Sequence, residues 1–299
     1  MSNTINAITK YVPLLDEKYK WEAKSSILDA PETMVRMTDN AKTIKIAKRT
    51  LEGLADYNKA GGFVSRDITL EWQEHTLAYD RGAKFQVDAM DDEETAGLSF
   101  GNLAGDYIRL HVAPELDAYR FAKYYDAAEN KVTGTITNEN VVQAFDTAML
   151  TMDDAEVPEE GRILFVSPAV FAAMKTNNTM SRKLDLKDMG QSINRNIYDI
   201  DGVTVIKVPQ GRFQTGITLQ DGTTSGQEEG GFESDGEDIN FLLIHPTSVF
   251  QIGKHTAPRI FNPATNQDAD AWRYDYRIYG DAFALEEKTS GIYGHAKEA

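Results

Sequence analysis

The side chains that could carry chemistry in this 299-residue chain are five histidines and 47 acidic residues. No two histidines have the three- or four-residue spacing that places a pair of zinc ligands on one helix face. Carboxylates are so frequent that an acid–base pair can always be chosen, so their presence identifies no site. We therefore expect structural histidines and no cofactor. The histidines are His75, His111, His245, His255 and His295.

Motifs of other catalytic classes are missing as well. We find no phosphate-binding loop, dinucleotide fingerprint or nucleophile elbow. The chain has no cysteine, which excludes disulfides, thiolate metal sites and cysteine nucleophiles. The acidic segment 221–238 reads as a mobile loop, and it lacks the ligand spacing of a calcium loop. A soluble hydrolase using acids such as Asp91 or Glu115 is a distant alternative, favoured only by the abundance of acids.

Composition narrows the class of protein further. A hydrophobic fraction of 41% and a charged fraction of 26% are ordinary for a folded protein. The net charge of -16 favours solubility and repels nucleic acid overall. No apolar run approaches the length of a membrane span, and the N-terminus lacks a signal-peptide pattern. We expect a protein made in the cytoplasm, with no membrane partner.

The first ninety residues favour an arm followed by β structure. Large apolar residues precede and follow Pro13, and a proline disfavours a continuous helix. We therefore expect residues 1–40 to be an extended arm that lies on another surface. A helix packed on its own domain is the alternative. Residues 41–90 alternate apolar and polar side chains, with a flexible tip at Gly61-Gly62 and a turn signal at Asp80-Arg81-Gly82. The expected structure is a projecting hairpin that rests on a neighbour; an ordinary small sheet is the alternative.

A basic cluster lies in the first of these strands. Three interpretations are open: a solvated face, charge pairing with acids on another copy, and contact with phosphate. We rank them in that order. The cluster consists of Lys42, Lys45, Lys48 and Arg49.

A long helix follows, from Thr95 to about Ala128. Acids at 91–94 are placed to interact favourably with its N-terminal dipole. Pro114 should kink or split the helix. Its buried face is expected to carry residues spaced by three and four. These residues are Ile108, Val112, Leu116 and Tyr119.

The central region predicts a mixed domain. Asn138 can cap a helix that runs to about Met152, and Ser167-Pro168 is a strong helix start. Asp201-Gly202 predicts a tight hairpin. Buried strands are expected at 162–166 and 239–244.

The C-terminal segment 272–283 predicts a strand with two different faces. Large apolar residues at Trp272, Tyr274, Tyr276 and Ile278 alternate with Arg273, Asp275, Arg277 and Tyr279. A strand of this kind needs cover on both sides. An aromatic-rich β scaffold without catalytic motifs indicates a structural protein, one that builds a shape and does not catalyse a reaction.

Four segments, in this order, resemble the tailed-bacteriophage major capsid protein family: Tyr11–Leu28, Val112–Arg120, Ile163–Phe171 and Ile200–Pro209. The resemblance implies an α+β fold that is divided into five parts. These are an N-terminal arm at 1–40, an extended β-hairpin loop at 41–90, a peripheral domain with a spine helix at 91–130, an axial domain at 131–255, and peripheral C-terminal strands at 256–299.

The resemblance also implies a function and partners. The chain would assemble as pentamers and hexamers into an icosahedral virion shell around double-stranded phage DNA, bound non-specifically. A separate scaffolding protein, a portal and other head proteins would accompany it; an encapsulin-like compartment shell is the alternative. Candidate inter-subunit contacts are Lys45, Lys48, Arg49, Trp72, Tyr79, Arg273 and Arg277.

Overall fold

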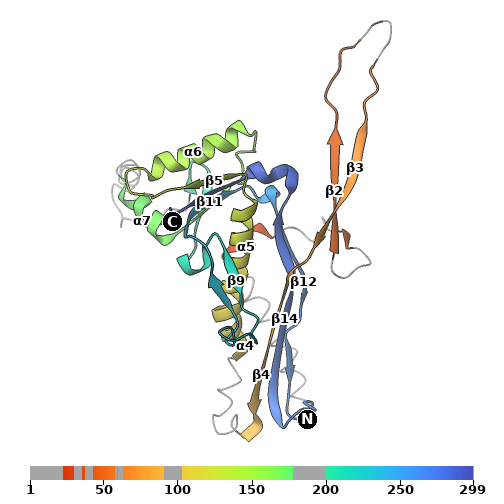
Figure 1. The fold of residues 1–299 in the computed structure, drawn as a ribbon, viewed down its shortest axis with the longest axis vertical. Helices are drawn as coiled ribbons and strands as arrows, with labels where there is room; N and C mark the ends of the chain where they lie inside the picture. The colour runs from red at the N-terminus through yellow and green to blue at the C-terminus, as the bar shows by residue number, and fades with distance from the viewer. Residues whose placement is uncertain are drawn as a thin grey trace, which may run out of the picture.

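The computed structural model describes residues 23–29, 36–37, 43–57, 59, 63–90, 103–177 and 199–298. Within them a six-stranded sheet and a long four-stranded sheet lie on either side of one helix, and a hairpin projects beyond one end of the long sheet (Figure 1). The expected arm anchors Tyr11, Leu15, Tyr19 and Trp21 lie outside the described residues, as do Lys42, the Gly61-Gly62 tip and the acids at 91–94.

The six-stranded sheet has two buried central strands. Its order is β5-β15-β11-β6-β8-β7. All four residues of β6 are buried, as the continuous apolar run predicts for a strand covered on both faces. Leu164 and Val166 pack against the helices α6 (Val141–Asp154) and α7 (Pro168–Thr176), whereas Phe165 packs towards the spine helix. The strands are β5 (Asn130–Thr133), β6 (Ile163–Val166), β7 (Asp199–Ile200), β8 (Val203–Lys207), β11 (Ile239–Ile244) and β15 (Ile292–Ala296).

Local signals position the helices and turns of this domain. Ser167 caps α7 (Pro168–Thr176), because its Oγ accepts a hydrogen bond from Val170 N at 3.3 Å. Asp201 and Gly202 both have positive φ, as the tight turn between β7 and β8 requires. These predictions are confirmed.

Two predictions in this region need correction. The helix α6 (Val141–Asp154) begins after Asn140, not at Asn138. The side chain of Asn140 accepts from Thr137 N at 2.7 Å and so stabilises the turn that precedes the helix. The acidic segment is not all loop, since β10 (Phe232–Ser234) pairs with β9 (Ile217–Leu219).

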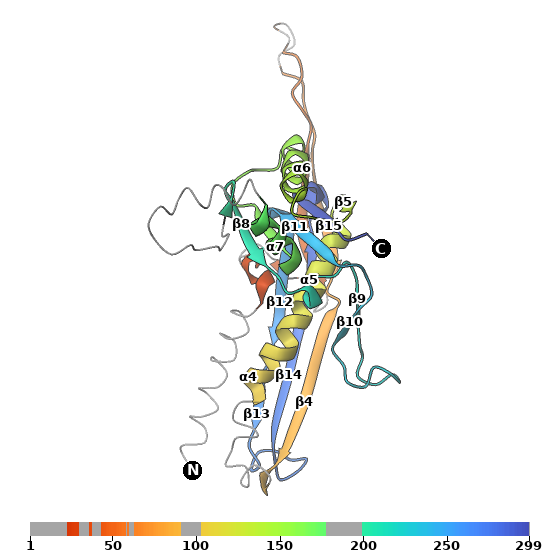
Figure 2. The same cartoon turned by 90° about the vertical axis from the view of Figure 1, so that its left-hand side faces the viewer.

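The spine helix changes its winding just before Pro114. It consists of α4 (Leu103–Tyr107), a π-helical turn (Ile108–Val112) and α5 (Ala113–Ala127), which follow one another along the long sheet (Figure 2). Proline lacks an N–H donor and crowds the carbonyl one turn earlier. The wider π turn accommodates it, so the expected kink or split is a local change of winding.

The long sheet is organised around β14 (Ala271–Ala284). Tyr274, Tyr276 and Ile278 pack against the spine-helix face that carries Ile108, which confirms the predicted amphipathic strand. The opposite face carries the charged residues. The other strands are β4 (Tyr79–Asp88), β12 (Val249–Thr256) and β13 (Arg259–Phe261).

The predicted turn at Asp80-Arg81-Gly82 is wrong, because these residues lie inside β4 and pair with β14. Ten consecutive pairs with β14 outweigh the local turn preference. Gly82 serves a different purpose, since a Cβ there would lie 2.9 Å from Tyr276 O. The glycine therefore permits close pairing of the two strands.

Sheet pairing does not follow the expected division at residue 255. Strand β12 pairs along β14 in the long sheet. Strand β15 leaves the long sheet and pairs with β11 and β5 in the six-stranded sheet. The chain therefore crosses between the two sheets once more than the sequence predicts.

Gly280 is a position where we expect substitution by alanine to be costly. A Cβ on Gly280 would clash with the backbone oxygen of Ile252 across the β12–β14 pair. Gly280→Ala should lower the free energy of unfolding by about 1–3 kcal/mol, measured by urea titration. Gly253→Ala, on the partner strand, meets no atom within 4 Å and serves as the control. Equal stability of both variants would contradict the argument.

Candidate assembly surfaces

The hairpin of β2 (Thr43–Leu51) and β3 (Ile68–Thr76) projects away from both sheets (Figure 1). Thirteen large hydrophobic side chains of the described residues are exposed, and eight of them lie on this hairpin or its tip. A concentration of this kind on one protruding element marks an interaction surface. The eight are Leu51, Leu54, Tyr57, Phe63, Val64, Ile68, Leu70 and Trp72.

The root of the hairpin is fixed to the body by apolar packing. Ile44 is fully buried in a cluster with Leu77, Phe250 and Ile252. His75 stacks on Phe283, with ring centroids 4.3 Å apart. The short β1 (Arg36–Met37) adds two pairs to β2. The projecting direction is therefore set by the core, while the distal half is left without cover from the described residues.

Two of the three hairpin basic residues expected to contact another subunit, Lys45 and Lys48, are paired within the chain. Lys45 forms an ion pair with Glu74 across the hairpin, and Lys48 forms ion pairs with Glu287 and, at 3.7 Å, Glu286. Arg49 is exposed. Trp72 has an exposed fraction of 46%. The predicted basic cluster is thus divided between the hairpin's two faces.

Tyr79 does not suit the expected role of an inter-subunit anchor. Its exposed fraction is 2%, and its hydroxyl donates to Glu115 Oε1 at 3.0 Å. It also packs on Tyr119, at a ring-centroid distance of 4.8 Å. The residue is part of the core beneath the spine helix, because β4 turns this side chain inwards.

Sequence reasoning missed the ion pair of Arg81 with Glu115, which joins three elements. Arg81 Nε lies 2.7 Å from Glu115 Oε1, and the same guanidinium donates to Gln220 O and Gly231 O at 2.7 and 3.0 Å. The contact connects β4, α5 and the loop between β9 and β10. Glu115, named as a candidate catalytic acid, is thereby engaged in a structural ion pair.

A second missed network lies on the other side of the spine helix. Asp117 is fully buried and accepts hydrogen bonds from Lys24 N, Ser25 N and Ser25 Oγ at 2.7–3.0 Å. Arg212 lies 3.3 Å from the same carboxylate. The segment Lys24–Leu28 is thereby held against its own chain. No local pattern marks these contacts, because the partners are 92 to 95 residues away in sequence.

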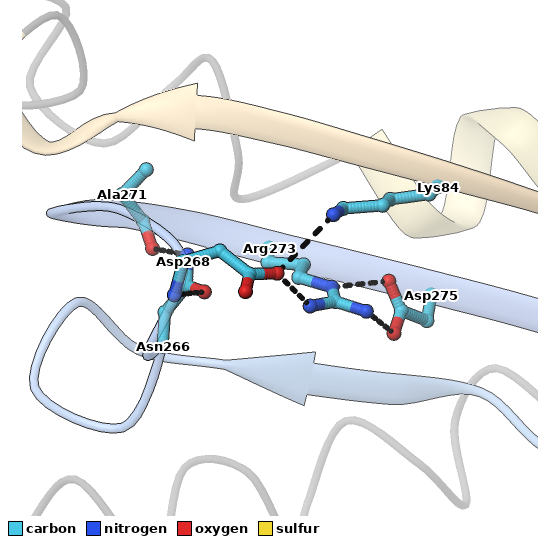
Figure 3. Close-up of polar contacts among 6 residues, drawn as sticks. All are labelled: Lys84, Asn266, Asp268, Ala271, Arg273 and Asp275. Carbon is cyan, nitrogen blue, oxygen red and sulfur yellow. Dashed lines mark hydrogen bonds and ion pairs between the residues drawn. The ribbon is translucent and has the colours of Figure 1, made fainter.

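The outer face of β14 carries ion pairs formed within the chain. Arg273 contacts Asp275 and Asp268 at 2.7 Å, and Lys84 approaches Asp268 at 3.4 Å (Figure 3). Arg277 pairs with Asp80 at 2.7 Å. The two arginines expected to reach a neighbour are thus on one face, already neutralised locally.

The histidines with defined partners are structural. His245 contacts Thr247 Oγ1 at 2.7 Å, and His295 contacts Asn240 at 3.1 Å. Burial lowers the pKa of both imidazoles below their ordinary value of 6.5.

Across the part of the chain that the structure describes, no group of three or more His, Asp or Glu residues could hold a metal ion. Within the same residues, no helix is long and apolar enough to cross a membrane.

Comparison with known proteins identifies the fold. No protein-family model matches the sequence, and no curated protein sequence does either. A solved structure from Mycobacterium phage Che8 is 15% identical, with a TM-score of 0.60, covering 90% of this chain and 89% of that one. The capsid of Cyanophage P-SCSP1u is 11% identical, with a TM-score of 0.63 and coverage of 88% and 85%.

A third solved structure has a different source. A virus-like particle from Pyrococcus furiosus is 9% identical, with a TM-score of 0.51, covering 96% of this chain and 99% of that one. The similarity in all three cases extends over most of both chains. The chain therefore has the fold found in phage capsids, with the α+β composition that the sequence predicts.

Proposed function

We propose that the chain is a major capsid protein that assembles into an icosahedral shell enclosing double-stranded phage DNA. The projecting hairpin is the observation that carries the proposal, because its apolar side chains are exposed on a fold found in phage capsids. Burial of apolar surface is the main driving force of protein association. Many weak contacts of this kind stabilise a closed shell.

In this proposal each part of the chain has its own place in the shell. The six-stranded sheet and its helices lie around the five-fold and six-fold axes. The hairpin lies over the long sheet of an adjacent subunit, where the face carrying Arg273 and Arg277 is available. The N-terminal arm reaches a neighbour.

Other head components follow from the same proposal. A separate scaffolding protein directs assembly, and a portal occupies one vertex. The contact with DNA is non-specific, and the net charge of -16 keeps the shell from binding the packaged polyanion tightly. The mature protein is located in the virion.

A compartment shell of the encapsulin kind is the second candidate. The observation in its favour is the nearly complete mutual coverage with the Pyrococcus furiosus particle. Such a shell encloses a cargo protein and no genome. Co-purification of one stoichiometric cellular protein, with no need for scaffold, would favour it over a phage head.

Electron microscopy of the expressed protein tests the proposal. We expect negative-stain images to show closed shells or capsomers, formed alone or with a scaffolding protein. A chain that stays monomeric at every protein concentration and ionic strength, with and without scaffold, would refute it. The presence of DNA inside shells isolated from infected cells would distinguish a phage head from a compartment shell.

A further inference from the structure

The two faces of the β2–β3 hairpin are chemically different, and the strand register defines them. Residues directly opposite in an antiparallel pair share a face, and successive residues point to opposite faces. Leu51 pairs with Ile68, and Ala47 pairs with Trp72. We call this the stripe face; it carries Thr43, Lys45, Ala47, Arg49, Leu51, Ile68, Leu70, Trp72, Glu74 and Thr76. We call the other the body face; it carries Ile44, Ile46, Lys48, Thr50, Thr69, Glu71, Gln73 and His75.

Contacts of the hairpin with its own body come from the body face. Ile44 and Ile46 join the apolar root cluster, and His75 stacks on Phe283. Lys48 forms its ion pairs with Glu287 and Glu286. Further out, this face carries Thr50, Thr69 and Glu71, with no large apolar side chain. The body face is therefore apolar where it meets the body and polar where it leaves it.

The stripe face has the opposite distribution. Its large apolar residues lie in the distal half, with exposed fractions of 57% for Leu51, 70% for Ile68 and 56% for Leu70. Because the two faces of a strand pair point in opposite directions, a hairpin whose body face meets the body turns this stripe away from it. An apolar stripe of this extent on a monomer marks a surface for a partner.

Charge indicates that the partner is a second copy. The chain carries -16 overall, so two copies repel each other. The hairpin is neutral, with five basic and five acidic residues between 43 and 76, so a contact through it avoids the repulsion that the net charge of the whole chain would cause. The basic residues are Lys45, Lys48, Arg49, Lys59 and Arg66; the acidic residues are Glu52, Asp56, Asp67, Glu71 and Glu74.

We propose that the stripe face is the surface that the hairpin buries on a second copy of this chain, and that the distal body face stays in solvent. This inference rests on the proposed self-assembly and specifies its orientation. Leu51, Ile68 and Leu70 are the apolar anchors, with Trp72 beside them. Arg49, on the same face, selects a partner surface that offers a carboxylate.

The absence of cysteine allows a direct test, because a single introduced thiol is the only one to react. Ala47→Cys places it on the stripe face and Thr50→Cys on the body face; both positions are exposed in the single chain. We expect a maleimide to label both variants before assembly. In assembled particles, labelling of Ala47→Cys should fall at least tenfold while Thr50→Cys still reacts.

A matched pair of triple variants adds a second readout. Leu51→Asn, Ile68→Asn and Leu70→Asn together should abolish particles, whereas Thr50→Asn, Thr69→Asn and Glu71→Asn together should leave them. Both sets replace exposed strand residues, so unfolding of the monomers should differ little. Particles in which Ala47→Cys stays reactive, or in which the body-face set is the damaging one, would overturn this inference alone. Wild-type chain that never self-associates would overturn the proposed function with it.

Discussion

Replacing residues 53–66 by Asn-Gly, which leaves Glu52 and Asp67 on either side of a two-residue turn and keeps Leu51 opposite Ile68, is expected to give a folded chain that no longer forms particles. The replaced tip contains four of the eight exposed hydrophobic residues of the hairpin, with Leu54 and Phe63 each more than 90% exposed. Tyr57 and Phe63 pack on each other, at a ring-centroid distance of 5.0 Å, and on no other ring of the described residues. We therefore expect these apolar side chains to be buried only when the tip contacts another subunit.

The fold of the single chain should tolerate this change. The root cluster around Ile44 and the β2–β3 register both lie outside the replaced range. Asn-Gly is the dipeptide that closes tight hairpins most readily. The free energy of unfolding should change by no more than about 0.5 kcal/mol, as is usual for surface changes.

Particle yield after sedimentation, followed by negative-stain microscopy, is the measurement. A control variant carries Asp56→Ser and Lys59→Ser, which removes one negative and one positive charge from the same tip and keeps its apolar residues. The control should assemble like the wild type. Normal particles from the Asn-Gly variant would show that the tip is not an inter-subunit clamp.

Local patterns in the sequence predicted the elements well where the local signal and the tertiary pairing agree. The alternation in β14 placed Tyr274 and Tyr276 inside and Arg277 outside, as the burial pattern has it. The Ser167-Pro168 start and the Asp201-Gly202 turn are similar cases. The helix cap and the positive φ angles each depend only on residues within four positions of one another, so a short sequence pattern is enough to predict them.

Predictions failed where a distant partner decided the structure. Asp80-Arg81-Gly82 has turn composition, yet pairing with residues 277–279 keeps it extended. Tyr79 looked like a surface aromatic, but Glu115 and the spine helix cover it. Single-sequence periodicity holds no information on which strand lies alongside, so neither result could be derived.

The sequence predicted the projecting hairpin but not how its basic residues are distributed over the two faces. Alternation between residues 43 and 72 predicted a projecting hairpin, and the structure has one. The basic cluster seemed to be one patch, whereas Lys45 and Arg49 lie on the stripe face and Lys48 lies on the body face. The partners of Lys48 are Glu286 and Glu287, more than two hundred residues away, and only the folded chain brings them together.

Asp117→Ala should cause the largest loss of stability in the single chain. Its carboxylate, which is fully buried, accepts from two backbone N–H groups and one hydroxyl of Lys24–Ser25 and pairs with Arg212, whose side chain is 22% exposed. Alanine leaves these donors and the guanidinium without their acceptor. Removing one partner of a buried ion pair costs about 3–5 kcal/mol, so we expect a loss of that size in urea unfolding.

Two further variants show whether the network is the cause. Asp126→Ala, on the same helix with a side chain that is 86% exposed, should change stability by no more than about 0.5 kcal/mol. Ser25→Ala alone should destabilise the chain, yet add much less when Asp117 is already alanine, because both changes break the same contacts. Fully additive losses, or an Asp117→Ala loss below about 1 kcal/mol, would mean that this carboxylate does not hold the N-terminal segment on the spine helix. A loss of unfolding free energy of the expected size, with clear non-additivity, would identify Asp117 as the group that fixes the segment Lys24–Leu28 on the spine helix. Any arm that reaches a neighbour would then extend from this segment.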